Sequence, residues 1–185
     1  MSTEQNAAIS LLRKQIQGAH QLLQGTMQSV TADMAHWTPD GSANPIDANY
    51  AHVVLGEDGL INGMLKGSAP LFAATWAGKT GINQMPPSPD PAHPGFPNWS
   101  AWAHDVQIDL QALHGYAQAV FAATDAYLAT LNDGDLQGKA DLSALGFSES
   151  SIADALNGGI LSNTYTHTGE IACLKGLQGA QGYPF

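Results

Sequence analysis

Apolar residues recur at intervals of three and four along most of this chain, whereas alternation with a period of two is scarce. Such spacing gathers apolar side chains on one face of an α-helix and predicts an all-α protein. The first such stretch predicts a helix of about thirty residues, or roughly 45 Å. It is expected to end near Pro39, because a proline restricts the residue before it and cannot continue a helix. Its apolar stripe comprises Ile9, Leu12, Ile16, Leu23, Met27, Val30 and Met34.

Three further helices are predicted by the same spacing. The second covers 48–65, although its three glycines are poor helix formers. The third covers 99–131 and keeps the three-four rhythm without a break, with Asn98 and Ser100 as candidate caps. The fourth covers 151–177 and is expected to bend at its Gly-Gly pair. The last seven residues are expected to be non-helical, with the terminal aromatic side chains packed back on the helices.

A long connection over 77–98 separates the second and third helices and holds six of the ten prolines. A proline-rich stretch of this length indicates a surface loop. The chain shows no internal repeat and no linker between separate cores. Together these features predict one domain over 1–185, a four-helix bundle with one long crossover-type loop.

Charge and composition narrow the classes of partner. The 185 residues include 44% hydrophobic and 12% charged residues, and the formal net charge is -10. A chain this acidic repels phosphate backbones and anionic membrane surfaces, which excludes nucleic acid as its main partner. One cysteine cannot form an internal disulfide, the first ten residues do not resemble a secretory signal, and no apolar run could cross a bilayer. We therefore expect a cytoplasmic protein without a membrane partner.

Candidate chemistry reduces to histidine, because the sequence has no phosphate-binding loop, dinucleotide fingerprint, paired cysteines or nucleophile elbow. His167 falls within an apolar stripe, with Asn163 one turn before it and Glu170 one turn after it. His52 lies near the start of the second helix and is followed by Glu57. If these helices are neighbours, His52 and His167 can face one another across the bundle, as the ligands of bundle metal sites do.

Simpler interpretations stand beside this one. A single histidine on an amphipathic helix is usually a half-exposed polar residue, and an interior asparagine is more often a hydrogen-bonding amide than a metal ligand. His93 is interpreted as solvated, and Cys173 as a small buried apolar residue rather than a nucleophile. The remaining histidines that lack a partner at ligand spacing are interpreted as surface or structural residues; they are His20, His104 and His114.

Several segments resemble a known family in their order and spacing. They are Trp37-Thr38-Pro39, Ala43-Asn44-Pro45-Ile46, Ala51-His52-Val53-Val54 with Glu57-Asp58, Val120 to Asp125, and His167-Thr168-Gly169-Glu170-Ile171 running into Lys175 to Gly179. By these segments the chain resembles the DinB-like (DinB/YfiT) superfamily of four-helix bundles, over nearly its whole length. The segment that begins at His167, with its glycine-rich end, is the most specific of them.

This resemblance implies a divalent metal, nickel or zinc, held by three histidines. By motif, His52 takes the position on the second helix and His167 the last position on the fourth. The remaining position is occupied by Asn163, where the family has a histidine. An amide is a poorer donor to a first-row metal than an imidazole, so the resemblance implies a site that is weakened, changed in metal preference, or vacant.

Two functions follow from the resemblance and from the asparagine at the third ligand position. In the first, the chain is a metal-dependent transferase that acts with a small-molecule thiol, with Glu170 or Glu57 orienting an imidazole. In the second, it is a non-catalytic binding or interaction protein with a degenerate metal site. A homodimer is expected in both, from the family and from the low surface charge.

Overall fold

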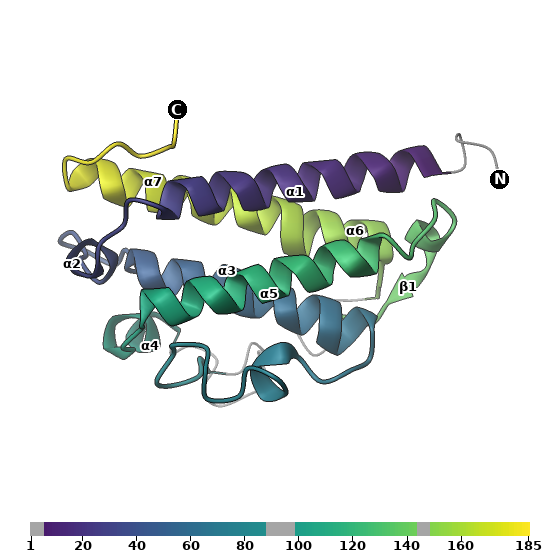
Figure 1. Ribbon diagram of the computed structural model, residues 1–185, viewed down its shortest axis with the longest axis horizontal. Coiled ribbons are helices and arrows are strands. Elements are labelled where there is room, and N and C mark those ends of the chain that lie inside the picture. The colour runs from purple at the N-terminus through teal and green to yellow at the C-terminus, as the bar shows by residue number, and fades with distance from the viewer. Residues whose placement is uncertain (1–5, 88–98, 144–148) are drawn as a thin grey trace.

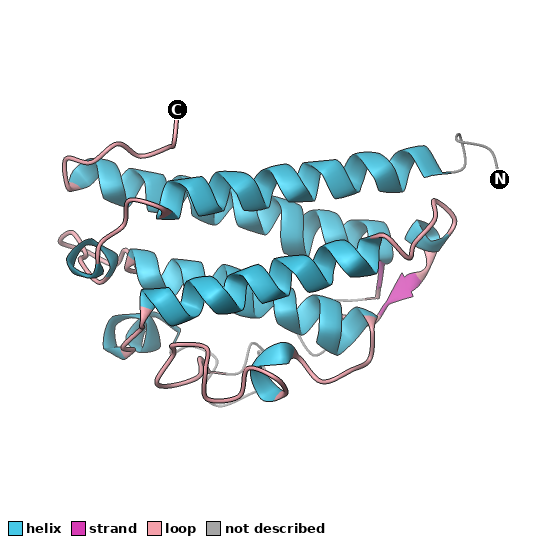
Figure 2. Ribbon diagram, viewed as in Figure 1, coloured by secondary structure: helices cyan, strands magenta, loops and turns pink. Residues whose placement is uncertain are grey.

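The computed structural model describes residues 6–87, 99–143 and 149–185, and over these residues the chain is all-α as predicted. Long helices run side by side along the molecule, with α1, α7, α3 and α5 each packed against two neighbours in that order around the bundle (Figure 1). Among the described residues, strand occurs only as a short antiparallel pair, β1 (Lys139–Ala140) and β2 (Ser150–Ser151), between α5 and α6 (Figure 2).

The first helix, α1 (Ala7–Met27), ends earlier than the apolar stripe predicts. A second short helix, α2 (Ala32–Ala35), follows, and the Thr31 side chain accepts its first capping hydrogen bond. At the end of α1 the buried Lys175 ammonium donates to the carbonyl oxygen of Thr26 at 2.6 Å. A cation on a terminal carbonyl stabilises a helix end there. The predicted single helix is therefore wrong beyond Met27.

The second predicted helix matches α3 (Ile46–Asp58) and its continuation, a π-helical segment over Gly59–Leu65. A similar π-helical segment, Asn157–Ser162, joins α6 (Ile152–Leu156) to α7 (Asn163–Leu177). The two wide segments approach each other closely, since a Cβ atom at Gly159 would lie 2.6 Å from the Leu60 side chain. The expected irregularity at the Gly-Gly pair is thus a change of helix type.

The third predicted helix is interrupted. It consists of α4 (Trp99–Asp105) and α5 (Leu110–Leu128), separated by residues 106–109. These residues pair with the loop before them instead: Asp109 donates its backbone N–H to Gly81 at 2.8 Å, and Ile108 forms a β-bridge with Ile82. The Asp109 side chain then caps α5 by accepting from the next turn. Val106 stays buried, which explains the unbroken apolar rhythm. Ser100 lies inside α4, and Asn98 lies outside the described residues.

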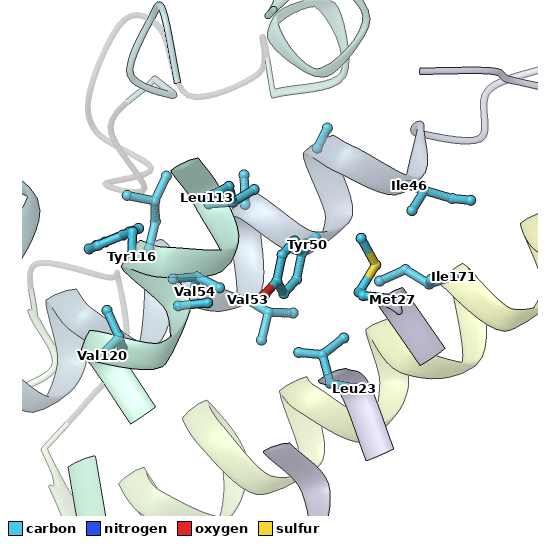
Figure 3. Close-up of a cluster of buried hydrophobic side chains, with 14 of the residues drawn as sticks. Leu23, Met27, Ile46, Tyr50, Val53, Val54, Leu113, Tyr116, Val120 and Ile171 are labelled. Carbon is cyan, nitrogen blue, oxygen red and sulfur yellow. The ribbon is translucent and has the colours of Figure 1, made fainter. Parts of the chain in front are cut away.

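Two groups of buried apolar side chains fill the bundle. One lies where the end of α1 meets the start of α3, with α5 and α7 closing it (Figure 3). It includes Leu23, Met27, Tyr50, Val53, Leu113, Val120 and Ile171. The other lies towards the opposite end and includes Ile9, Ile16, Leu60, Leu128, Leu156 and Ile160.

The C-terminal segment after α7 is non-helical, as predicted, but its aromatic rings pack on the bundle only in part. Tyr183 and Phe185 stack on each other with ring centroids 5.5 Å apart, and Phe185 is 86% exposed. Pro184 rather than Phe185 packs closely, against Gly25 of α1. None of the described helices combines the length and the hydropathy needed to cross a membrane.

Candidate functional site

The imidazole rings of His52 and His167 meet at the interface between α3 and α7. Their ring centroids lie 4.7 Å apart, and the ring planes make an angle of 72°. The two residues are 115 positions apart in the chain (167 − 52), and only the packing of α3 against α7 brings them together. Their convergence agrees with the pairing made from sequence, whereas their role as metal ligands stays a prediction.

Asn163 and Glu170 of α7 each lie beside one of these rings. The Asn163 side chain, one turn before His167, raises the pKa of His52 and so favours the protonated form of that ring. Glu170 lies on the other side, with its Oε2 atom 2.7 Å from Nδ1 of His167. A carboxylate can only accept, so the imidazole donates from Nδ1 and keeps an unprotonated Nε2 when neutral. This leaves the Nε2 lone pair of His167 available to an electrophile.

The environment of His52 keeps its ring uncharged. Trp99 of α4 packs against one side with ring centroids 4.9 Å apart, and His167 lies on another. Burial lowers the pKa of His52 to about 4, and the neighbouring imidazole adds to this effect, while Asn163 and Glu170 oppose it. Near neutral pH the ring is therefore an unprotonated nitrogen donor in a largely desolvated position.

The donor set fits a transition-metal cation only in part. Two imidazoles converge, and one of them carries the carboxylate partner that is typical of metal-bound histidine. The third side chain at the site is the amide of Asn163, a weaker donor. Over the residues that the structure describes, no group of three or more His, Cys, Asp or Glu side chains is placed to hold a metal ion. The structure thus brings together two imidazoles and one amide.

A second polar cluster, which the sequence analysis missed, lies inside the bundle. The Nε2 atom of His20 donates to Oε2 of Glu57 at 2.9 Å, and the hydroxyl of Thr124 donates to the other carboxylate oxygen. His20 also stacks on Phe121 with ring centroids 3.9 Å apart. These three hydrogen-bonded side chains are buried, so each polar group satisfies another. Glu57 thus orients His20 and not His52, which corrects one of the two predicted roles.

The neighbouring carboxylate of Asp58 fixes the loop after α3. Tyr116 donates to its Oδ2 atom at 2.6 Å, and Asn62 donates to Oδ1 at 2.7 Å. The backbone N–H groups of Leu71 and Phe72 each donate to it at 2.9 Å. Burial and this carboxylate together raise the pKa of Tyr116 above its usual range. Asp58 is therefore fully engaged in the fold and is not free to bind a ligand.

Several other sequence assignments can now be compared with the structure. Cys173 is exposed, because it faces away from the bundle on the same side of α7 as Glu170 and Leu177; the prediction that it is buried is wrong. His104 is half-buried on α4, and His114 of α5 lies 3.2 Å from the hydroxyl of Tyr50. The predicted solvation of His93 lies outside the described residues.

The chain matches a family model over most of its length, including the candidate site. A family model described as the DinB superfamily matches residues 15–171, most of the chain. The chain belongs to the DinB superfamily. Within this DinB-superfamily protein, the matched region contains both imidazoles, Asn163 and Glu170.

A solved structure shares the fold. It is described as a crystal structure of a conserved protein from Enterococcus faecalis, with a TM-score of 0.73 and 20% sequence identity. The similarity covers 91% of this chain and 95% of that one, so the likeness concerns the whole bundle. None of the curated proteins compared with this chain matches it.

Proposed function

We propose that this DinB-superfamily protein binds a divalent transition-metal ion, zinc or nickel, through His52 and His167, with Asn163 as the third and weakest ligand. The observation that carries the proposal is the convergence of the two imidazoles, whose ring centroids lie 4.7 Å apart. Imidazole nitrogen is the donor that both metals prefer among the groups present here.

The residues around the two imidazoles favour their role as metal ligands. Desolvation keeps His52 unprotonated, so that no proton has to leave before the ring can act as a donor. The carboxylate of Glu170 holds the tautomer of His167 that leaves Nε2 free. Trp99 covers one side of His52 and limits its exposure to water. Together these contacts favour a fixed donor pair.

The activity that we propose for this site is that of a thiol-dependent transferase, in which a metal would activate a small-molecule thiol. A bound cation would stabilise a thiolate and so lower the pKa of a thiol that reaches it. Of the three ligand positions, the sequence departs from the family's pattern at Asn163, which would lower metal affinity while leaving the two imidazoles in place. A thiol substrate is supported by the family resemblance and by the suitability of a soft anion for such a metal.

One observation favours a second function, a non-catalytic binding protein with a degenerate metal site. The side chain at the third ligand position, Asn163, is an amide that raises the pKa of His52 and supplies no third imidazole. In this alternative the imidazole pair serves only to join α3 to α7. The two functions differ in one measurable property, the affinity of the natural chain for zinc or nickel.

Titration of the full chain with zinc, and separately with nickel, against a competing chromophoric chelator tests the proposal. We expect saturable binding at one site per chain, abolished by His52→Ala and by His167→Ala and retained by His104→Ala. His104 is a matched control because it is a half-buried histidine on another helix. Equal affinity in all four proteins would contradict the proposed ligands, and absence of binding in the natural chain would favour the degenerate site.

A further inference from the structure

A cleft on a different face of the bundle from the histidine pair has the chemistry of a second binding site. Its volume is about 480 Å³, and it lies between α1 and α5 over the start of α3. It is lined by Gln21, Gln24, Gly25, Gln28, Tyr50, His114 and Gln118. Tyr50 and His52 are two residues apart on α3, so their side chains leave the helix about 200° apart. The cleft is therefore separate from the candidate metal site.

The walls of this cleft carry side-chain amides on a surface that is otherwise largely apolar. Gln21, Gln24 and Gln28 follow one another at helical spacing along α1, and Gln118 extends from α5. Each amide offers both a donor and an acceptor group. The lining contains no carboxylate and no ammonium or guanidinium group, although the chain carries sixteen acidic residues. This is an uncharged surface on a strongly acidic protein.

The floor of the cleft is a phenol and an imidazole joined by a hydrogen bond. Burial raises the pKa of Tyr50 and lowers that of His114, so both groups are neutral near pH 7. The hydroxyl of Tyr50 and Nδ1 of His114 lie 3.2 Å apart and share a hydrogen bond. Tyr50 is fully buried, so His114 is the member of this pair that a ligand can reach, and it adds no charge to the floor.

We propose that this cleft binds a small uncharged molecule rich in hydroxyl groups, of the size and polarity of a monosaccharide. A charged ligand would lose hydration without meeting an opposite charge, which is costly. An apolar ligand would displace water from the amides without replacing its hydrogen bonds. Hydroxyl groups both donate and accept, as the amides do, and the volume lies within the range of small-molecule sites. This inference does not depend on a metal at His52 and His167.

The test uses the full chain labelled with ¹⁵N and three sugars of similar size. D-glucose is neutral, glucuronate adds a negative charge and glucosamine a positive one. We expect glucose at tens of millimolar to shift the side-chain amide NMR signals of Gln24 and Gln118 in a saturable way. Glucuronate and glucosamine should bind more weakly. Absence of any shift with glucose, or equal binding of a charged sugar, overturns the proposal.

Four matched variants locate the binding. Gln24→Ala and Gln118→Ala each remove an amide from the cleft, whereas Gln15→Ala and Gln111→Ala remove exposed glutamines of the same two helices outside it. All four positions are exposed, so each variant should fold. Loss of one hydrogen bond should weaken glucose binding about three- to tenfold in the first pair and leave it unchanged in the second. The same affinity in all four variants overturns the assignment to this cleft.

Discussion

Replacement of Asn163 by histidine should convert the weak third ligand into a strong one. Asn163 precedes His167 by one turn of α7, about 6 Å along the helix axis, and its side chain lies close enough to His52 to raise the pKa of that ring. We therefore expect an imidazole at this position to meet the other two without a movement of the backbone. The change also removes an amide that favours the protonated form of His52. Both effects favour binding of a cation.

The expected gain can be bounded from the behaviour of metal sites in general. Loss of an outer partner of a ligand costs about 10–100-fold in metal affinity. Exchange of a direct ligand from amide oxygen to imidazole nitrogen should change the affinity by at least as much, so we expect about 100-fold tighter zinc binding. This factor corresponds to about 2.7 kcal/mol at 25 °C.

Competition titration with zinc measures this gain, and Thr166→His supplies the control. Thr166 is exposed on the same turn of α7, so an imidazole there cannot join the pair. We expect Thr166→His to bind zinc as the natural chain does. Should Asn163→His bind zinc no more tightly than Thr166→His, the arrangement of ligands described above is refuted. Should only Asn163→His bind zinc, the natural site is degenerate.

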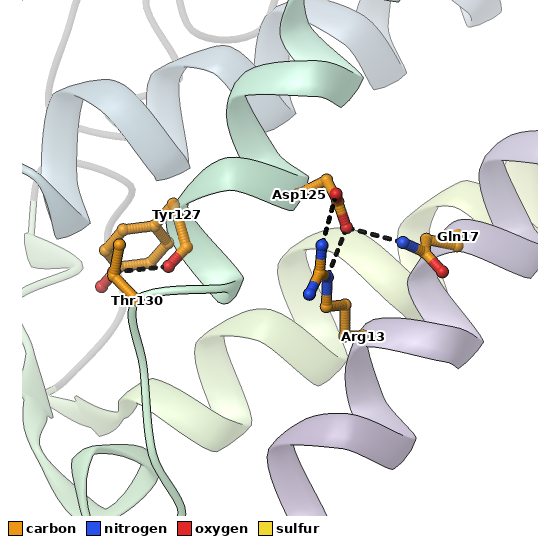
Figure 4. A network of polar contacts seen from close by, with 5 residues as sticks. All are labelled: Arg13, Gln17, Asp125, Tyr127 and Thr130. Atoms are coloured by element: carbon orange, nitrogen blue, oxygen red, sulfur yellow. Dashed lines mark hydrogen bonds and ion pairs between the residues drawn. The ribbon is translucent and has the colours of Figure 1, made fainter.

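Four further predictions concern stability and assembly. Glu57→Ala should destabilise the protein by about 2–5 kcal/mol in chemical denaturation, because it leaves a buried imidazole and a buried hydroxyl without their acceptor; a loss within experimental error would contradict this. Gly81→Ala should lower the melting temperature more than Gly78→Ala. Both glycines have positive φ, but only at Gly81 would a Cβ meet a backbone oxygen, at 2.4 Å. The bidentate contact of Arg13 with Asp125 (Figure 4) lowers the pKa of that carboxyl. The stabilisation from this ion pair is therefore present above the unfolded pKa of Asp125 and is lost as pH falls through its folded pKa. The free energy of unfolding of Arg13→Met should accordingly be lower than that of the natural chain at pH 7 and approach it in acid. A difference in unfolding free energy that does not change with pH would refute the assignment. Light scattering should show a dimer, and a species of 19.3 kDa at all concentrations would contradict that prediction.

The helices were predictable because their apolar spacing reflects burial along the bundle. The interruption at 106–109 was not, because Val106 is buried as it would be in a continuous helix. What breaks the helix is pairing with residues 81–83, which lie far away in the sequence. The early end of α1 has a similar cause, since the cation that caps it comes from Lys175. Neither contact can be recognised from the residues next to the helix end in the sequence.

The candidate site was predictable to the extent that a polar residue on an apolar face requires a partner. His52 and His167 were paired on this ground, and the structure places their rings together. The same reasoning could have found His20, which follows the buried Ile16 by one turn, and Glu57, which follows the buried Val53 and Val54. Which polar groups meet depends on the rotation of each helix, and the spacing along one chain does not specify it.

The decisive measurement for the His52–His167 site is the metal content of the full chain, purified without an affinity tag and then reconstituted with zinc or nickel. We expect close to one equivalent of metal per chain in the natural protein and a loss of that metal in His52→Ala and His167→Ala. Less than a tenth of an equivalent in the reconstituted natural protein would contradict it.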